Sequence, residues 1–441
     1  MTALTPDFGD PSRLTESLSA LSRGMHLSGI LRTANQVREL RAGGAEVLDF
    51  SIGDFGPKYF RIPEKLLRGV ERALESGATN YPPPPGLPAL RQAVTGYVER
   101  CSGVRYPAEA VLITSGGRPV LYAAYRTVIE PGDTVLYSVP SWNNDSYAWL
   151  SGANAVEIEA RSENGFQPTL GELEPHLRAA RLLCLCSPGN PTGTAMAPEM
   201  FEAILQAIVR ENRRREKEGN ERPLFLLYDQ MYSSIRVKDN KHRYALALVP
   251  EAAPYVLTMD GASKAFSATG LRIGWLLAPP AIVKKVGELV SHMGAWAPHA
   301  EQAGLTELLN DPDAIARYRE AMDAAVHERL DALHRGFVAM RNDGLPVDVL
   351  CPDGAIYVSL QLDLRGARIG ERVLENNEMI RSLVLEQAGV ALVPFQAFGL
   401  MRETGWFRLS VGAVSLEEIA EALGRIRKLL EQVTDRASSD R

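Results

Sequence analysis

The sequence has few of the features that mark membrane-spanning, secreted or nucleic-acid-binding proteins. It has no apolar run long enough to span a bilayer, and its N-terminus lacks the charged, apolar and small-residue order of a signal peptide. Lys and Arg total 48 against 54 Asp and Glu, so the net charge is −6 and there is no basic excess for nucleic acid or a lipid surface. We therefore expect a cytoplasmic protein without a membrane or nucleic-acid partner.

Cysteine is also scarce. The chain has four cysteines, and Cys184 and Cys186 fall inside the apolar run RLLCLC (181–186). Because a free cysteine behaves as a small apolar residue, we interpret these two as core residues and not as a disulfide or a metal-binding pair. No metal site is predicted.

Apolar residues are plentiful. They make up 45% of the 441 residues, enough for a large core spread over roughly two or three domains. Seven short apolar runs alternate with helical or polar stretches, and several are apolar throughout, as strands covered on both faces must be. This alternation predicts an α/β fold with a mostly parallel seven-stranded sheet between helices. The runs are AVLIT (110–114), TVLYSV (134–139), AVEIEA (155–160), RLLCLC (181–186), PLFLLYD (223–229), YVLTMD (255–260) and IGWLLA (273–278).

The texture of the sequence changes after Pro312. A long helical pattern (313–342) precedes fewer strand-like runs with flanking helices, which predicts a second, smaller α+β domain. We divide the chain into three parts. Residues 1–50 form an N-terminal arm and a helix that packs with the small domain, residues 51–305 form a large domain, and residues 306–441 form a small C-terminal domain. The elements expected in the last part are strands at 355–362, 389–394 and 406–412 and helices near 372–388 and from Leu416.

One helix of the large domain ends in the charge run ENRRREKEGNER (211–222). Because Arg and Lys are rarely buried, this run predicts a helix face exposed to solvent. It carries no functional prediction.

Two glycine-rich segments follow predicted strands, at the end of the sheet where open α/β proteins bind ligands. In TSGGRPVLYAAY (114–125), two glycines let the main chain approach a ligand, and the helix start offers free N–H groups to a phosphate; a plain turn is the alternative. In SPGNPTG (187–193), prolines and glycines form a rigid loop that fixes the amide of Asn190 for a ligand, or else only a tight turn.

Charged residues stand at two other strand ends. Asp229 ends PLFLLYD, where a buried carboxylate needs a structural partner or a cationic ligand, and Tyr232 could add a hydroxyl nearby. Lys264, in GASKAFSATGLRIGW (261–275), lies among small residues that leave room for a bulky group, and withdrawal from water would make its amine nucleophilic. Arg272 follows with a guanidinium suited to a phosphate.

Trp142 lies in PSW, directly after the predicted strand at 134–139. It is either a core or interface aromatic residue or a flat surface for a ligand ring. A lysine nucleophile, a strand-end carboxylate, an aromatic plate and a Gly-Gly cradle with an arginine together describe one ligand, an aromatic aldehyde phosphate with a basic ring nitrogen. The sequence therefore predicts pyridoxal phosphate as the cofactor, bound by the large domain (51–305).

With these motifs the sequence resembles the class I/II aminotransferases of fold type I, from about Ser28 to the end of the chain. The segments that carry the resemblance are YPPPPGLPALRQAV, TSGGRPVLY, SPGNPTG, YDQMY, SKAFSATGLRIGW and FRLSVG. The resemblance implies an aspartate aminotransferase-like fold that depends on pyridoxal 5'-phosphate. It also implies a transferase that moves an amino group between an L-amino acid and a 2-oxo acid by a ping-pong mechanism.

The resemblance also implies roles for single residues. Lys264 would form the internal aldimine and move the proton, Asp229 would pair with the pyridine nitrogen, and Tyr232 would bond the phenolic oxygen. Tyr81 would reach the phosphate from the partner subunit, so that active sites lie at the interface of a homodimer, and Arg408 would clamp the substrate α-carboxylate. The other implied cofactor contacts are Gly117, Arg118, Trp142, Asn190, Ser263 and Arg272. The other implied substrate contacts are Gly53, Arg118, Trp142 and Asn190.

Two segments bear on the substrate. The GGR and GASK motifs are similar to GGK and GAAK of bacterial aspartate aminotransferases, where the cradle lysine recognises a side-chain carboxylate. Arg118 keeps that charge on a longer, planar group, so we expect an acidic substrate similar to aspartate or glutamate. IGDFGPKYFRIP (52–63) replaces a GEPDF-like turn, and WNNDSY (142–147) replaces W-x-x-Y, which suggests that Asn143 and Asn144 line the pocket.

Other functions use the same residues. A β-lyase, a decarboxylase or a cyclase would share the constellation, because the outcome depends on which α-carbon bond lies perpendicular to the ring. A regulatory protein that binds pyridoxal phosphate would need a DNA-binding segment ahead of the fold. Residues 1–50 hold five Arg, no Lys and six Asp or Glu. This segment is too short for a DNA-binding domain and lacks the basic excess that such a domain needs.

Overall fold

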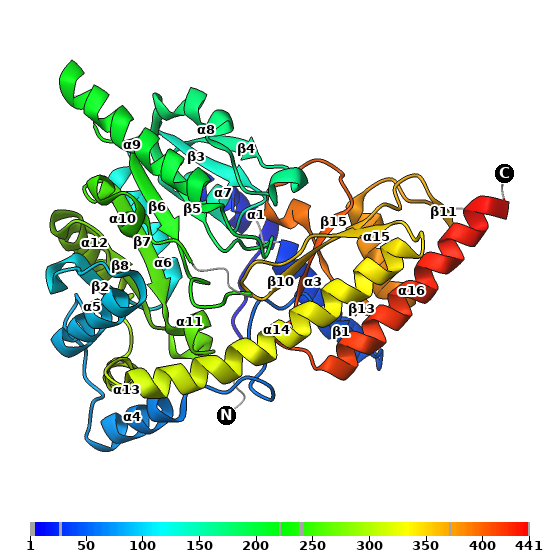
Figure 1. The fold of residues 1–441 in the computed structure, drawn as a ribbon, viewed down its shortest axis with the longest axis horizontal. Coiled ribbons are helices and arrows are strands. Elements are labelled where there is room, and N and C mark those ends of the chain that lie inside the picture. Colours follow the sequence, from blue (N-terminus) through cyan, green and yellow to red (C-terminus); the bar gives the residue numbers. More distant parts are fainter. Residues whose placement is uncertain (1–4, 26–28, 220–221, 238–241, 370–371, 440–441) are drawn as a thin grey trace.

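The protein is built around two β-sheets, and the computed structural model describes residues 5–25, 29–219, 222–237, 242–369 and 372–439 (Figure 1). The large sheet has seven strands in the order β2-β8-β7-β6-β5-β3-β4, and only β8 runs antiparallel to its neighbours. Each predicted apolar run forms one of these strands, so the predicted α/β fold is confirmed. The strands are β2 (Val111–Thr114), β3 (Thr134–Val139), β4 (Asn154–Glu159), β5 (Ala180–Cys186), β6 (Phe225–Asp229), β7 (Val256–Gly261) and β8 (Gly274–Leu277).

Helices cover both faces of the large sheet because its strands are apolar on both sides. In β5, Leu182 and Cys184 point into one core, and Leu183 and Leu185 point into the other. The first core is closed by α6 (Gly117–Val128) and α12 (Pro280–Met293), and the second by α8 (Leu170–Leu177) and α9 (Pro198–Glu218). The other helices around this sheet are α4 (Glu64–Glu75), α5 (Pro88–Ser102), α7 (Asn144–Ser151), α10 (Ala245–Leu248), α11 (Ala262–Ala265) and α13 (His299–Leu309).

The small sheet has four antiparallel strands in the order β14-β15-β10-β9. The helix α14 runs without a break from the large-sheet part to the small sheet, where it lies beside α16 (Figure 1). These elements are β9 (Val347–Val349), β10 (Tyr357–Leu362), β14 (Val393–Pro394), β15 (Trp406–Ser410), α14 (Pro312–Asn342) and α16 (Leu416–Ser439).

Two predictions for the C-terminal part were wrong. The run at 389–394 is not one strand: β13 (Val390–Ala391) pairs with β1 (Leu48–Asp49), and only β14 joins the small sheet. The helix expected near 372–388 begins later, as α15 (Asn377–Leu383) followed by a π-turn, because the Asn376 side chain caps its first turn. The short strands β11 (Arg368–Ile369) and β12 (Arg372–Val373) pair with each other ahead of it.

The charge run at 211–222 is only partly a solvated face, and its residues 220–221 lie outside the described residues. Arg215 is buried, and its guanidinium donates to Glu211 and to three main-chain carbonyls within 177–180. The burial of this arginine is compensated by these acceptors, because a guanidinium can serve several carbonyls at once.

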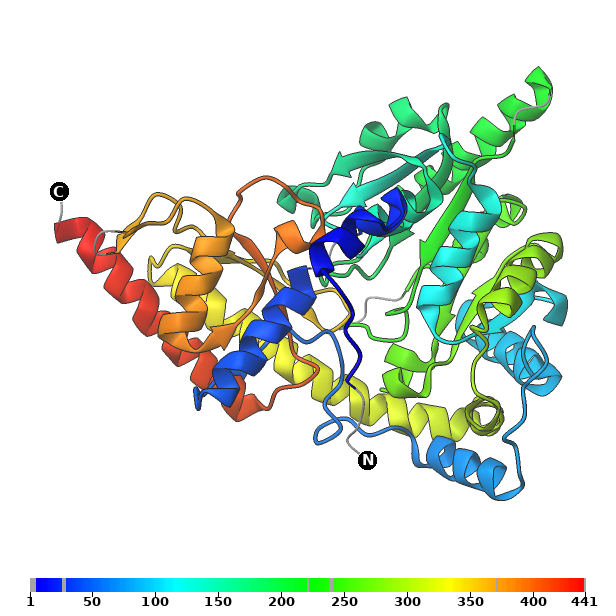
Figure 2. The same ribbon diagram turned by 180° about the vertical axis from the view of Figure 1, so that it is seen from behind.

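The N-terminal segment lies across both sheet parts (Figure 2). Leu21 accepts a hydrogen bond from the indole of Trp149 at 3.1 Å, whereas α3 contacts β14 and the turn at 395–398. Residues 1–4 and 26–28 of the predicted arm lie outside the described residues, and the proposed domain boundaries stay a prediction. The helices of this segment are α1 (Pro11–Glu16), α2 (Ala20–Arg23) and α3 (Gly29–Ala42).

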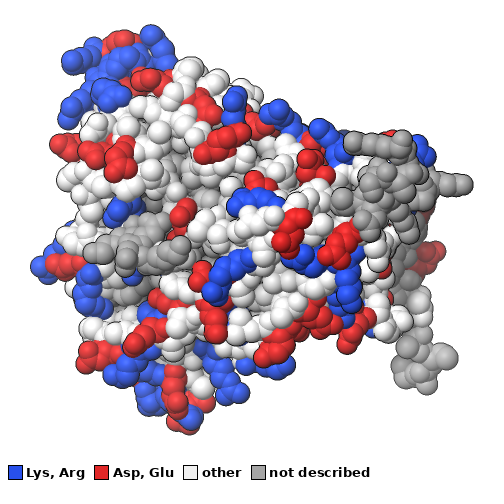
Figure 3. Space-filling model, turned by 45° about the vertical axis from the view of Figure 1, so that its right-hand side comes forward, with Lys and Arg blue, Asp and Glu red and all other residues white. Residues whose placement is uncertain are grey.

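Acidic and basic side chains intermingle on the face of the molecule shown in Figure 3. Within the described ranges, no helix is long and apolar enough to cross a membrane. The same ranges contain no group of three or more His, Cys, Asp or Glu placed to hold a metal ion.

Candidate active site

A cavity of about 300 Å³ lies where the carboxyl ends of the parallel strands face the small sheet. Each loop that leaves β3, β5, β6 and β7 at this edge contributes side chains to it, and β15 contributes one from the other side. Every residue predicted for the site lines this cavity except Tyr81 and Asn144. The predicted residues that line it are Gly53, Gly117, Arg118, Trp142, Asn143, Asn190, Asp229, Tyr232, Ser263, Lys264, Arg272 and Arg408.

Asp229, the last residue of β6, places a carboxylate at the base of the cavity. Its oxygen accepts the main-chain N–H of Met231 at 2.9 Å, and no Lys, Arg or His of the described chain forms an ion pair with it. The side chain lies deep in the protein with one side toward the cavity, and this burial raises the pKa of Asp229 to about 6. A cation bound in the cavity would supply the missing partner.

Lys264 lies in α11, which begins directly after β7. Its Nζ donates to the carbonyl oxygen of Gly53 at 2.7 Å, and the residue is only 9% exposed. Burial lowers the pKa of Lys264 to about 8, and the Asp54 carboxylate, 4.0 Å away, offsets part of that shift. The amine therefore loses its proton at a pH where ordinary lysines stay charged, which makes it a usable nucleophile.

An anion cradle stands at the start of α6. Gly116 has a φ of +80°, and a Cβ at this position would lie 2.4 Å from a guanidinium nitrogen of Arg272, so glycine is required here. Arg272 is held by its hydrogen bonds to the carbonyl oxygens of Thr269 and Ser115. The free N–H groups of the helix start and this guanidinium suit a phosphate.

Arg408 carries a second guanidinium, in the middle of β15. It is 1% exposed; Nη1 donates to the Asn190 side chain at 3.0 Å and Nη2 to the Ser51 carbonyl at 2.6 Å. Its buried Nε has no hydrogen-bond partner among the described residues. A positively charged planar guanidinium that lines a cavity is suited to a carboxylate.

Trp142 and Arg118 meet on one wall of the cavity. The Arg118 guanidinium lies 4.6 Å from the Trp142 ring centroid, in cation–π contact. Asn143 also lines the cavity, as the sequence had suggested. Its main chain adopts a left-handed φ of 59°. Asn144 does not line it, because its side chain bonds the hydroxyls of Ser141 and Tyr125 instead.

The sequence analysis missed several residues that line the cavity. Tyr357, at the start of β10, shares a hydrogen bond with the Tyr232 hydroxyl, but in the sequence it looked like one more core residue of a strand. Asp54 lies in the unusual segment at 52–63, and that departure from the family pattern could have indicated that Asp54 lines the cavity. The other missed residues are Ile30, Leu31, Leu121, Met231, Met259 and Thr269.

Tyr81 lies outside the cavity on the surface of the chain. It is 85% exposed, and its ring packs edge-on against Trp296 at 5.5 Å. Its contact with a phosphate across a subunit interface stays a prediction.

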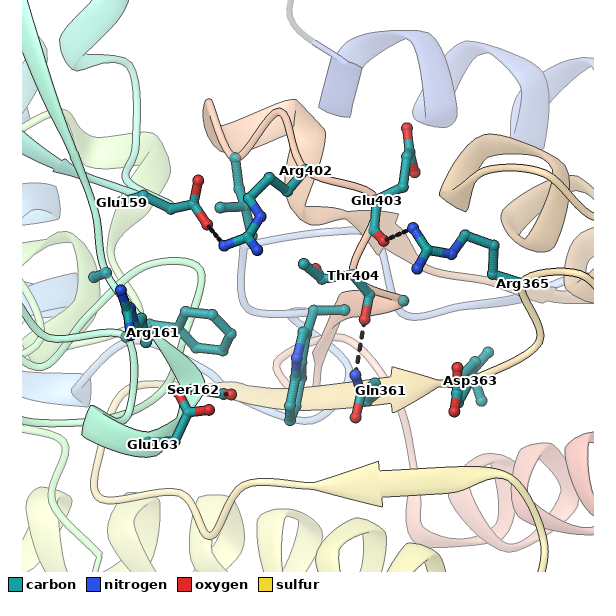
Figure 4. Close-up of a pocket in the computed structure, with 16 residues that line it drawn as sticks. Glu159, Arg161, Ser162, Glu163, Gln361, Asp363, Arg365, Arg402, Glu403 and Thr404 are labelled. Atoms are coloured by element: carbon teal, nitrogen blue, oxygen red, sulfur yellow. Dashed lines mark hydrogen bonds and ion pairs between the residues drawn. The ribbon is translucent and has the colours of Figure 1, made fainter.

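A larger cavity, of about 610 Å³, lies between the end of β4 and the small sheet (Figure 4). Arg402 pairs with Glu159 across it at 2.7 Å, and Arg365 donates to the carbonyl oxygen of Glu403 at 2.9 Å. The described residues that line it include no Lys, Cys or His, and none of the predicted site residues. The smaller cavity, with its amine and unpaired carboxylate, is therefore the candidate active site.

Comparison with known proteins shows which family the chain is similar to over most of its length. The family model "Aminotransferase class I and II" matches residues 45–426. An aspartate aminotransferase of Streptomyces avermitilis is 29% identical and covers 99% of this chain and 100% of its own. An aspartate/prephenate aminotransferase of Thermus thermophilus is 29% identical over 94% of this chain and 98% of its own. A solved aspartate aminotransferase of Thermus thermophilus with maleate superposes with a TM-score of 0.82 at 27% identity, covering 94% of this chain and 100% of that one.

Proposed function

The chain belongs to the class I and II aminotransferase family, and from this premise we propose that it uses pyridoxal phosphate in the Lys264 cavity and prefers acidic L-amino acids. The protein is a transferase that moves amino groups. One observation carries the proposal: the buried Lys264 amine and the unpaired Asp229 carboxylate face the same cavity as three guanidinium groups.

The residues fit this cofactor. The Asp229 carboxylate would take the protonated pyridine nitrogen as its missing cation, and the Gly117 main chain with Arg272 would hold the phosphate. Trp142 offers a flat face to the ring. When bound, pyridoxal phosphate supplies an aldehyde that accepts the amino group and a ring that withdraws electrons from the substrate α-carbon. The residues proposed to complete its binding site are Asn190, Tyr232 and Ser263, with Tyr81 of the partner subunit.

Two residues handle the substrate directly. Arg408 binds the α-carboxylate through its guanidinium, with Asn190 and the Gly53 main chain assisting. Lys264 takes the proton from the α-carbon, because burial lowers the pKa of its amine to about 8 and a large fraction of the amine is neutral at that pH.

The preference for an acidic side chain rests on Arg118. It lines the cavity and presents a fixed guanidinium against Trp142, which suits a second carboxylate on the substrate. The relatives named as aspartate aminotransferases support this choice.

We also propose that the enzyme is a cytoplasmic homodimer with active sites at the interface. The exposed ring of Tyr81 supports this assembly, because a Tyr that is 85% exposed has a side chain available to a second subunit.

A steady-state assay tests the proposal. With L-aspartate and 2-oxoglutarate we expect parallel double-reciprocal lines and a kcat/KM at least about tenfold above that for L-alanine, since one charge-assisted contact is worth roughly that factor. Lys264→Ala should abolish turnover, whereas Lys284→Ala, on the exposed face of α12, should not. Ammonia release from an amino acid with a β-leaving group, without transfer to an oxo acid, would instead indicate a lyase.

A further inference from the structure

Tyr357 touches three parts of the candidate site at once. Its hydroxyl bonds the Tyr232 hydroxyl, and its ring lies 4.6 Å beneath the Arg408 guanidinium. A Cβ on Gly53 would lie 2.7 Å from the Tyr357 hydroxyl, so the main chain of that segment packs directly against it. Tyr357 comes from the small sheet and Tyr232 from a loop of the large sheet, so this hydrogen bond also joins the two sheet parts.

The two hydroxyls have one hydrogen bond between them, so only one can be its donor. If Tyr357 donates, the hydrogen of Tyr232 stays free for an acceptor in the cavity; if Tyr232 donates, it can only accept there. Burial raises the pKa of both phenols, and the Arg408 charge offsets part of that rise at each. The Arg408 guanidinium lies directly against the Tyr357 ring, so Tyr357 is the phenol whose acidity this charge favours more. The more acidic hydroxyl is the better donor, which favours the order Tyr357 to Tyr232 to the cavity.

We propose that Tyr357 is a positioning residue whose hydroxyl donates to Tyr232 and so couples the carboxylate clamp at Arg408 to the hydrogen bond that Tyr232 offers the cofactor. This inference rests on the proposed function. Hydrogen bonds in such a chain strengthen one another, so the link from Tyr357 makes Tyr232 a better donor to the phenolic oxygen.

The coupling has a direction. A substrate carboxylate on Arg408 neutralises the positive charge over the Tyr357 ring, which weakens Tyr357 as a donor and then Tyr232. The phenolic oxygen of the bound cofactor becomes more basic as a result. The other titratable groups that act on Tyr357 are Cys186 and Asp54, and neither lies between it and Arg408 in this chain of contacts.

Tyr357→Phe tests the coupling because it keeps the ring under Arg408 and removes only the hydroxyl. We expect the dissociation constant of maleate, measured by calorimetry on the cofactor-loaded enzyme, to change less than about twofold, because Arg408 keeps its other partners. The pH midpoint of the visible absorption change should rise, and the further rise caused by maleate should shrink. kcat should fall roughly tenfold with little change in KM, as for one lost hydrogen bond.

Tyr137→Phe is the matched control. Tyr137 is equally buried, and its hydroxyl donates to Glu157 at 2.8 Å, away from the cavity. It should leave the pH midpoint and the maleate effect as in the wild type. If Tyr357→Phe also leaves both unchanged, or weakens maleate binding and catalysis together as a general loss of structure would, the coupling is refuted.

A second variant keeps the inference testable if Tyr357→Phe does not fold. Tyr232→Phe interrupts the same chain, so the maleate effect on the pH midpoint should shrink there too, and the double variant should differ little from Tyr232→Phe alone. Additive effects of the two changes would overturn the coupling. The proposed function fails separately, because a protein that gives no visible band with pyridoxal phosphate would exclude the cofactor itself.

Discussion

Replacing Asp229 by Asn should stabilise the cofactor-free protein while weakening cofactor binding. Burial raises the pKa of Asp229 from 3.8 to about 6, so the folded protein keeps this proton at a pH where the unfolded chain has lost it. Between these two pKa values the free energy of unfolding falls as the pH rises. Above pH 6 the folded protein bears the full cost of an ionised, buried carboxylate. Two pKa units correspond to about 3 kcal/mol, an upper estimate of what Asn recovers at pH 8. Met231 can still donate to the amide oxygen, so no hydrogen bond is lost.

Urea unfolding of the cofactor-free protein at pH 5 and pH 8 measures this effect. Asp229→Asn should raise the free energy of unfolding at pH 8 and about half as much at pH 5, because pH 5 lies midway between the two pKa values. It should also lower the affinity for pyridoxal phosphate about 10- to 100-fold. Asp260→Asn is the control: Asp260 is 5% exposed, but its oxygens accept from Gly261, Gln230 and Ser233, and an amide oxygen and nitrogen cannot satisfy all three donors. This variant should therefore lose hydrogen bonds that Asp229→Asn keeps. A loss of stability for Asp229→Asn at pH 8, or the same change in the free energy of unfolding at both pH values, would refute the claim that Asp229 is an unpaired, buried carboxylate.

Three further predictions follow from the charged groups. In the cofactor-free protein, the rate at which Lys264 condenses with pyridoxal phosphate should rise through pH 8, and Asp54→Asn should lower that midpoint; a midpoint near 10 would contradict the burial of the amine. Arg118→Gln should raise the KM for L-aspartate roughly tenfold and leave that for L-alanine unchanged in steady-state assays, and equal changes would exclude side-chain recognition. Arg402→Ala should leave the urea midpoint of unfolding close to that of the wild type, because the ion pair of Arg402 with Glu159 is exposed, and a clear fall of the midpoint would show that solvent does not screen this pair.

The sequence was sufficient to predict the large sheet and most of the cavity. Strands such as β5 are apolar at every position because both of their faces are covered, and this pattern is visible without a structure. Parallel strands end at one edge of a sheet, so polar residues that follow them, such as Asn190, Asp229 and Lys264, come together there.

The remaining features depend on contacts between distant segments. Arg215 is buried where it donates to the carbonyls of residues 177, 178 and 180, and nothing in its own charge run indicates those carbonyls. Tyr357 is one of several consecutive buried residues of β10, so the sequence does not set it apart. Its role depends on Tyr232 and Arg408, which lie far away in the sequence. Asn144 turns from the cavity because Tyr125, on a neighbouring helix, offers it a hydroxyl.

The most direct test of the central claim is the absorption spectrum of the purified protein with pyridoxal phosphate, before and after L-aspartate is added without an oxo acid. The account predicts a visible band that depends on Lys264, is lost when aspartate is added, and returns with 2-oxoglutarate, with one amino group stored per active site. A protein that gives no band in excess cofactor, or whose band survives Lys264→Ala, would contradict it.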